Sequence, residues 1–186
     1  MRKDRRPRTT VAGGWLVKRS VTLLTMALLF SVLPQNYAAQ RESPRQEAEQ
    51  WEEVAKLRIQ AARGHEVQAE RKRDQAFRLV GNFMAAGDAL DIAGDEKYLA
   101  SEAYQIASKQ WEKAAKAFKA GADPDKANDA LGEAAAAWSA AKRTLREGAD
   151  LYKIAEEQFE NLGELDKKIK VIEKSARNIE RLMEMR

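Results

Sequence analysis

Carboxylates are the side chains of this sequence whose spacing comes closest to a chemical site. Glu156 and Glu160 are four residues apart, so a helix would place both on one face, where oxygen ligands can hold a hard cation. A di-iron bundle adds Glu-x-x-His motifs to such carboxylates, but the only histidine is His65. Adjacent acids such as Glu52 and Glu53 are typical of a solvated helix surface in a chain with 33% charged residues. The sequence therefore predicts no metal site and no catalytic carboxylate pair.

Other catalytic and cofactor-binding groups are also missing from the sequence. There is no cysteine, which excludes a thiol nucleophile, an Fe–S cluster and a disulfide framework. A single histidine excludes a zinc site built from several histidines, and the sequence has no glycine-rich phosphate-binding loop. We therefore expect a protein that is not an enzyme, with no catalytic residue, no cofactor and no small-molecule substrate.

Basic side chains offer a different chemistry, the binding of a partner. The run Arg71-Lys72-Arg73 is of a kind that attracts nucleic acid or anionic lipid. Carboxylates at three positions within residues 66–74 lie next to it, so a solvated helix surface is the preferred interpretation.

The net charge of +4 does not indicate a nucleic-acid-binding protein. Seven basic residues and one acidic residue fall within residues 1–39, which leaves 26 basic and 28 acidic side chains in the remaining chain. The basic character belongs to the N-terminal extension, so we expect no nucleic-acid partner.

Residues 1–39 have the organisation of an export signal, in which a basic start is followed by an apolar segment. As a helix, roughly 15 residues around the apolar segment 20–33 would span about 22 Å, less than the ~30 Å hydrocarbon core of a membrane. A cut after Ala38 or Ala39 leaves no small residue three positions before it, so an uncleaved anchor that holds residues 20–33 at a membrane is the alternative to cleavage. We expect the protein to be exported, to the periplasm or to the outer face of a membrane.

Heptad patterns dominate residues 40–186, which we expect to form a single all-α domain. One row of large apolar residues repeats every seven positions: Leu131, Trp138, Leu145, Tyr152 and Phe159. A mostly small row follows three positions later: Ala134, Ala141, Gly148, Ala155 and Leu162. Such paired rows are typical of closely packed helices.

Capping and turn residues divide this region into four helices. Ser43 with Pro44 begins the first helix and Gly87 ends it, while Asp95 begins the second. The segment 121–124 contains a glycine, a capping aspartate and a first-turn proline, which indicates a helical hairpin. Leu165 to Met183 supply an apolar face to the last helix. The expected helices span about residues 44–86, 95–120, 124–162 and 164–183.

The first of these helices is the one whose apolar face is not closed. Alanine recurs every seven residues from Ala48 to Ala76, but the adjacent ridge carries Arg58, His65 and Lys72. Burying such charges without partners would cost several kcal/mol, and the other helices can cover one another. We therefore predict that residues 55–75 are exposed and bind a partner that offers carboxylates. The candidate partner-binding residues are Arg58, His65, Lys72 and Arg73. The alternative is a solvated helix that only extends the bundle.

The hairpin at residues 108–141 resembles a tetratricopeptide repeat, a helix-turn-helix of 34 residues with large and small residues at fixed places. Those places are occupied by Trp111, Ala115, Phe118, Ala127, Leu131 and Ala134, with Gly121 in the turn. The chain is also similar to the longer helical hairpins of membrane-fusion adaptors of the SNAP type. The resemblance implies an α-helical scaffold that binds proteins and has no catalytic activity.

The sequence thus predicts four long helices packed as antiparallel hairpins, either a helical bundle or a short TPR-like array with coiled-coil packing. The favoured function is an exported adaptor or assembly factor that binds another protein. The alternative is a structural subunit that self-associates within an envelope or extracellular assembly.

Overall fold

Four helices make up the part of the chain that the computed structural model describes, residues 43–79 and 81–185, and this part contains no strand. They are α2 (Pro44–Arg78), α3 (Phe83–Ala120), α4 (Pro124–Leu162) and α5 (Leu165–Glu184). The prediction of an all-α helical bundle is confirmed for these residues. The predicted export signal, residues 1–39, and its apolar segment 20–33 lie outside the described residues.

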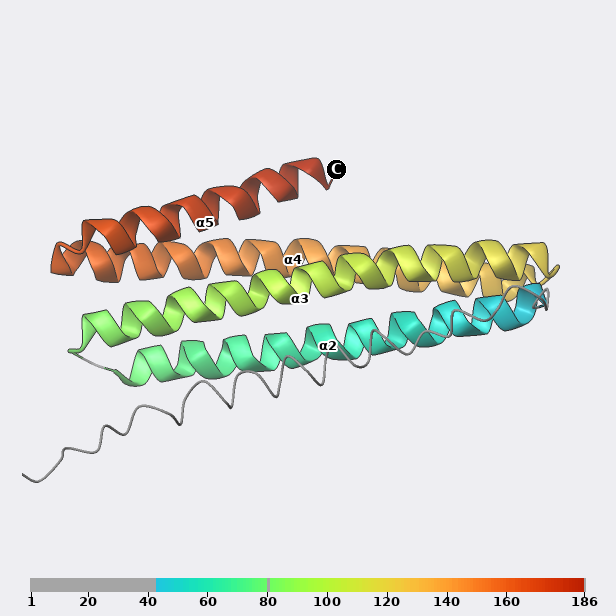
Figure 1. Cartoon of the computed structure of the whole chain (residues 1–186), viewed down its shortest axis with the longest axis horizontal. Coiled ribbons are helices and arrows are strands. Elements are labelled where there is room, and N and C mark those ends of the chain that lie inside the picture. Colours follow the sequence, from blue (N-terminus) through green and yellow to red (C-terminus); the bar gives the residue numbers. More distant parts are fainter. Residues whose placement is uncertain (1–42, 80, 186) are drawn as a thin grey trace, which may run out of the picture. The chain divides into compact units, whose positions relative to one another are not determined.

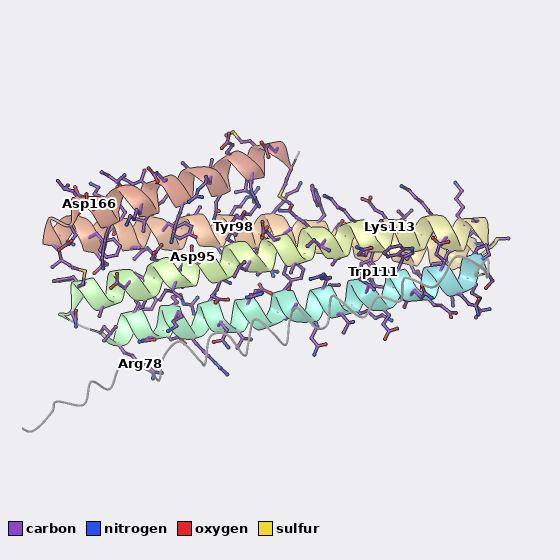
Figure 2. All side chains as sticks on the ribbon, viewed as in Figure 1. Arg78, Asp95, Tyr98, Trp111, Lys113 and Asp166 are labelled. Carbon is purple, nitrogen blue, oxygen red and sulfur yellow. The ribbon has the colours of Figure 1, made fainter. Side chains whose placement is uncertain are left out.

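Helices that are consecutive in sequence pack side by side and antiparallel (Figure 1). α3 lies between α2 and α4, and α4 lies between α3 and α5. α5 is the shortest helix and runs along only one half of α4 (Figure 1). Figure 2 shows Asp95 and Tyr98 in the half that includes α5, and Trp111 in the half where only α2, α3 and α4 lie together.

The boundary between the first two helices differs from the prediction. α2 ends at Arg78 rather than near residue 86, and α3 begins at Phe83 rather than Asp95. The break contains Gly81, at φ 84°, and Asn82, whose side chain accepts a hydrogen bond from the Ala85 amide at 3.1 Å. Gly87 lies inside α3, where a Cβ would come 2.6 Å from Cε1 of Phe159. That glycine therefore serves helix packing and does not end a helix.

The later boundaries agree closely with the sequence signals. Asp123 caps α4 by accepting a hydrogen bond from the Lys126 amide at 3.2 Å, and Pro124 occupies the first turn. Gly163 ends α4 in the left-handed conformation, at φ 72°, where glycine is the favoured residue.

Alanine forms the contact between α2 and α3. The buried residues of α2 are all alanines, seven apart, and α3 carries a matching buried row. The two rows are Ala48, Ala55, Ala62, Ala69 and Ala76 on α2, and Ala86, Ala93, Ala100, Ala107 and Ala114 on α3. Because the distance between helix axes depends on the side chains at the contact, these two small rows permit a close approach.

Between α3 and α4, glycine faces aromatic rings. Gly94 lies against the ring of Tyr152, just as Gly87 lies against Phe159. The large row of α4 is buried from Leu145 to Phe159. Leu131, at the other end of that row, is 51% exposed, because α5 does not extend to the first turns of α4 (Figure 1).

α5 turns an unexpected face toward the other helices. It buries Val171, Ser175 and Asn178, and Lys174 bridges to α3 through Asp91 at 2.6 Å and Asp95 at 3.0 Å. The apolar face that the sequence predicts for this helix points instead toward solvent.

Replacement of Gly94 by alanine should destabilise the protein, because the new Cβ would overlap the buried ring of Tyr152. Overpacking of this kind costs about 1–3 kcal/mol. Gly132→Ala is the matched control, since Gly132 is also inside a helix and no described atom lies within 4 Å of a Cβ there. The control should gain up to about 1 kcal/mol from helix propensity. Urea unfolding followed by circular dichroism measures both, and equal stabilisation by the two changes would contradict the packing.

Candidate partner-binding groove

A groove runs between α2 and α4, and α3 forms its floor. We call it the α2–α4 groove. Its floor consists of four α3 side chains that are seven residues apart, all buried: Lys97, Tyr104, Trp111 and Phe118. The heptad spacing of α3 thus aligns one lysine and three aromatic rings along the groove.

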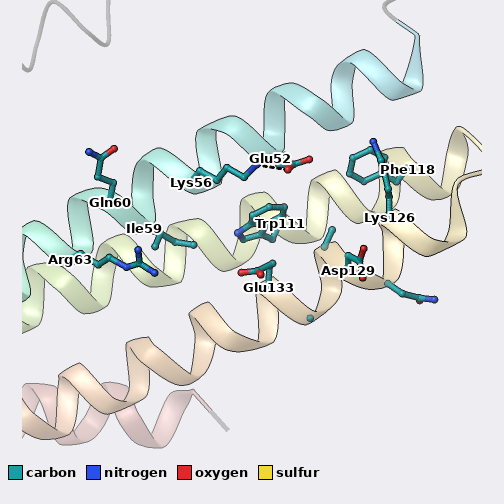
Figure 3. A pocket seen from close by; sticks show the side chains of 13 residues that line it. Glu52, Lys56, Ile59, Gln60, Arg63, Trp111, Phe118, Lys126, Asp129 and Glu133 are labelled. Atoms are coloured by element: carbon teal, nitrogen blue, oxygen red, sulfur yellow. Dashed lines mark hydrogen bonds and ion pairs between the residues drawn. The ribbon is translucent and has the colours of Figure 1, made fainter.

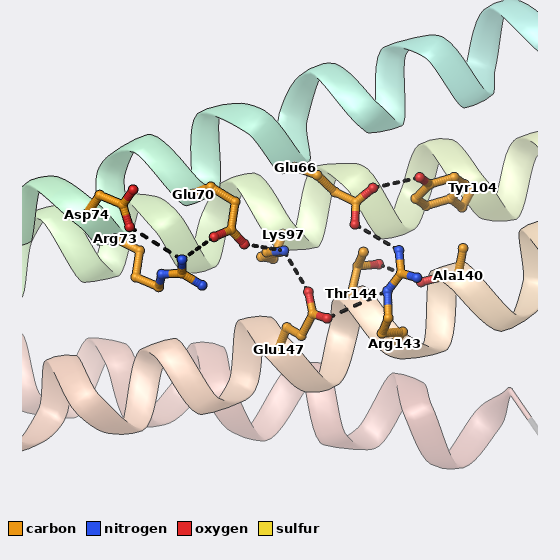
Figure 4. Close-up of polar contacts among 10 residues, drawn as sticks. All are labelled: Glu66, Glu70, Arg73, Asp74, Lys97, Tyr104, Ala140, Arg143, Thr144 and Glu147. Carbon is orange, nitrogen blue, oxygen red and sulfur yellow. Dashed lines mark hydrogen bonds and ion pairs between the residues drawn. The ribbon is translucent and has the colours of Figure 1, made fainter.

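Ion pairs close the middle of the groove (Figure 4). The Lys97 ammonium donates a hydrogen bond to Glu147 of α4 at 2.6 Å and lies 3.2 Å from a carboxylate oxygen of Glu70 on α2. Its side chain is only 6% exposed. A buried charge requires partners of opposite charge, so Lys97 holds both walls against the floor.

A second set of contacts lies one turn further along. Glu66 of α2 accepts hydrogen bonds from the Tyr104 hydroxyl at 2.7 Å and from Arg143 of α4 at 2.9 Å. Burial, together with the hydrogen bond to Glu66 and its charge, raises the pKa of Tyr104 to about 12. The hydroxyl therefore remains a donor at neutral pH, and the contact between α2 and α3 is maintained.

Beyond Tyr104, toward Phe118, the groove is open (Figure 3). Within the described residues, no ion pair joins α2 to α4 in this part. The opening has a volume of about 1030 Å³, and Ile59, Trp111 and Phe118 supply its apolar surface. It is large enough for several side chains of a bound segment.

The walls of this opening carry charges of both signs. Arg63 lies on α2, while Asp129 and Glu133 lie on α4. None of these three forms an ion pair within the part of the chain that the structure describes. Lys56 is paired on its own helix, with Glu52 at 2.6 Å, and Lys126 lies over the Phe118 ring, 5.3 Å from its centroid.

Trp111 provides an unsatisfied donor at the floor of the open part. Its Nε1 atom is buried and has no hydrogen-bond partner among the described residues, and Figure 3 shows the ring near Ile59 and Glu133. A buried unpaired donor costs about 1–3 kcal/mol. An acceptor that entered the groove and displaced the neighbouring side chains would satisfy it.

The sequence-predicted binding residues do not form one patch. His65 lies on the flank of α2 away from the groove, with Nδ1 2.7 Å from a carboxylate oxygen of Glu96, and Arg58 and Lys72 share its ridge at seven-residue spacing. Arg58 and Lys72 are both half-buried. Arg73 lies on the groove side and pairs with Glu70 and Asp74.

The groove was not predicted from the sequence, because Tyr104, Trp111 and Phe118 have the seven-residue spacing that core residues also have. The available signal was Lys97, which continues the row of Tyr104, Trp111 and Phe118 one heptad earlier. A lysine in an otherwise apolar row indicates a place where carboxylates from neighbouring helices converge.

No cluster of three or more metal-ligating side chains occurs in the described residues. Glu156 and Glu160, which have a spacing suited to a cation, lie 3.8 Å and 3.0 Å from the ammonium of Lys168 on α5. In the same part of the chain, no helix is long and apolar enough to cross a membrane.

Removal of both carboxylates around Lys97, in a Glu70→Gln/Glu147→Gln variant, should destabilise the protein by about 3–5 kcal/mol, because it leaves a buried ammonium without a counter-charge. Lys97→Met is the control: it leaves Glu70 and Glu147, which are both about two-fifths exposed and can be hydrated. The Lys97→Met variant should therefore lose less unfolding free energy than the double variant. Urea unfolding measures both variants, and a larger loss for Lys97→Met would show that the lysine is held by packing and not by its ion pairs.

Comparisons with family models, curated proteins and solved structures found no match to this chain. The TPR-like assignment of residues 108–141 therefore remains a prediction from residue types. In the structure, five of the six residues that carry it are buried, and Leu131 is exposed.

Proposed function

We propose that this protein is an exported, non-enzymatic adaptor or assembly factor that binds a segment of another protein in the open part of the α2–α4 groove. The observation that carries the proposal is the combination of an aromatic floor with Arg63 on the α2 wall and Asp129 and Glu133 on the α4 wall, none of which forms an ion pair with a described residue.

A protein segment suits these features better than the other classes of ligand. Trp111 and Phe118 can pack against an apolar side chain, and the unpaired indole N–H can donate to a backbone carbonyl. Arg63 on one wall and the acids on the other fit a segment that carries charges of both signs. Nucleic acid is disfavoured because Asp129 and Glu133 would face its phosphates.

The ion pairs in the closed middle of the groove hold in position the helices that also form its open part. Lys97 and Arg143 fix the positions of α2 and α4 relative to α3, so a segment that enters has to move side chains, such as those that cover the Trp111 indole, but not whole helices. Binding to a preorganised site loses less conformational entropy. The likeness of residues 108–141 to a tetratricopeptide repeat supports the same class of ligand, since that family binds proteins.

The self-associating alternative has an observation of its own. The apolar face of α5 is exposed along the whole helix, and it lies on a different part of the molecule from the groove.

Photo-cross-linking of the full chain in its native cells tests the groove. A photoreactive residue at Gln60, which lines the groove, should capture a partner, and the same residue at Glu53, on the outward side of α2, should not. Arg63→Glu should reduce capture about tenfold, which corresponds to a loss of roughly 1.4 kcal/mol of binding free energy. Arg71→Glu, an exposed arginine of the same helix outside the groove, is the matched control. Equal capture at Gln60 and Glu53 would contradict the proposal.

Intact-mass measurement of the native protein tests export separately. Cleavage after the predicted signal should give a chain that begins near Gln40. A mass that includes residues 1–39 would support the anchor alternative, and recovery of that full-length chain from the cytoplasm would contradict export.

A further inference from the structure

α5 covers only part of the face that α3 and α4 form together, and no described helix lies over the rest of it (Figure 1). The C-terminal end of α5 reaches α3 at Gln105, whose Nε2 atom lies 3.5 Å from Sδ of Met185. From Gln105 to Ala120, α3 continues for about 22 Å beyond this contact, at roughly 1.5 Å per residue. We call the surface formed by residues 106–120 of α3 and residues 124–135 of α4 the uncovered face.

One row of α3 side chains runs from the covered part of this face into the uncovered part. Its members are seven residues apart: Asp88, Asp95, Glu102, Lys109 and Lys116. The first three are acidic, and each pairs with a base of α5, in the order Lys167, Lys174 and Arg181. The last two are lysines. The row therefore changes from acidic to basic at the point where α5 ends.

The basic end of the row has no partner in the described part of the chain. Lys109, Lys116 and the neighbouring Lys119 are exposed, and none of them forms an ion pair with a described residue. Two acids border the same face, Glu112 of α3 and Asp125 of α4, and they are also exposed and without an ion pair among the described residues. Both lysines of the row are thus available at the positions that pair with α5 elsewhere on α3.

An apolar cleft of about 440 Å³ lies between these lysines and α4. Ala115 and Ala127 are buried at its base, and Leu131 forms its α4 side with 51% of its surface exposed. Lys116 and Lys119 line its α3 side. The cleft has room for more than one large apolar side chain. It is distinct from the α2–α4 groove, although the two openings have one lining residue in common, Asn128.

We propose that the uncovered face binds an acidic amphipathic helix of a partner protein, placed where α5 would continue. The contact of α5 with α3 and α4 shows that a helix fits this face and forms ion pairs at seven-residue spacing along α3. Because the same row carries Lys109 and Lys116 further on, the incoming helix bears carboxylates at the positions where α5 bears bases. Its apolar side chains enter the cleft beside Leu131.

Other occupants fit this face less well. The α5 helix of a second copy is unsuitable, because the bases that it turns toward α3, Lys167, Lys174 and Arg181, would face lysines, and like charges repel across an interface. Nucleic acid is disfavoured because Glu112 and Asp125 would face its phosphates.

Photo-cross-linking of the full chain in its native cells identifies the occupant. A photoreactive residue at Leu131 should capture a partner protein, and mass spectrometry should show that the cross-linked segment carries acidic and apolar residues at helical spacing. The same photoreactive residue at Glu53, on the outward side of α2, is the control. The control should capture the segment at least tenfold less.

Charge reversal tests the lysine row. Lys109→Glu with Lys116→Glu should reduce capture at Leu131 at least tenfold. Arg71→Glu with Lys170→Glu is the matched control: it changes the net charge equally at two exposed bases outside the face, and capture should be unchanged. Both variants should fold, since exposed charges contribute little to stability, and thermal unfolding followed by circular dichroism checks this.

The inference is independent of the groove proposal, because Arg63→Glu in the groove should leave capture at Leu131 unchanged. It is overturned if capture at Leu131 does not exceed capture at Glu53. It is also overturned if the captured segment is basic, lacks acidic residues or belongs to a second copy of this chain. A third contrary result is a reversal of Lys109 and Lys116 that reduces capture no more than the control reversal.

Discussion

The close approach of α3 to its two neighbours is the constraint on which the rest of this structure depends. On one side, α2 buries five alanines toward α3, and Ala86, Ala93 and Ala114 of α3 lie in the same core clusters as some of them. On the other side, Gly87 and Gly94 make room for the rings of Phe159 and Tyr152. Larger side chains in these rows would force the helices apart, so the small residues determine how near α2 and α4 come to each other across α3.

That proximity creates the groove and determines its chemistry. Because α2 and α4 both lie close to α3, carboxylates from each can reach Lys97, and Glu66 can reach both Tyr104 and Arg143. These polar contacts hold the middle of the groove closed. Further along α3, the row continues with Trp111 and Phe118, which cannot form ion pairs with the walls, and the groove is open there. One heptad row thus provides both the closure and the proposed binding floor.

The unequal lengths of the helices account for the remaining exposed apolar surface. α5 runs along only one half of α4, so Leu131 lacks a covering helix. α5 itself is attached by a small buried face and by lysine–carboxylate pairs. The apolar face of α5 from Leu165 to Met183 takes no part in this attachment and is exposed. The groove and the exposed apolar face of α5 are therefore separate surfaces of the protein.

The sequence by itself determined the all-α class, the paired heptad rows and the turn at residues 121–124, because these depend on local periodicity and on capping residues. It did not determine which row faces which neighbour. Gly87 gave the same signal as a helix end although it serves packing against Phe159, and the ridge of Arg58, His65 and Lys72 gave no sign that Glu96 would contact His65. Heptad spacing specifies which residues share a face of a helix. Only the tertiary packing decided that Lys97 and Trp111 would form the floor of a groove and that the apolar face of α5 would point to solvent.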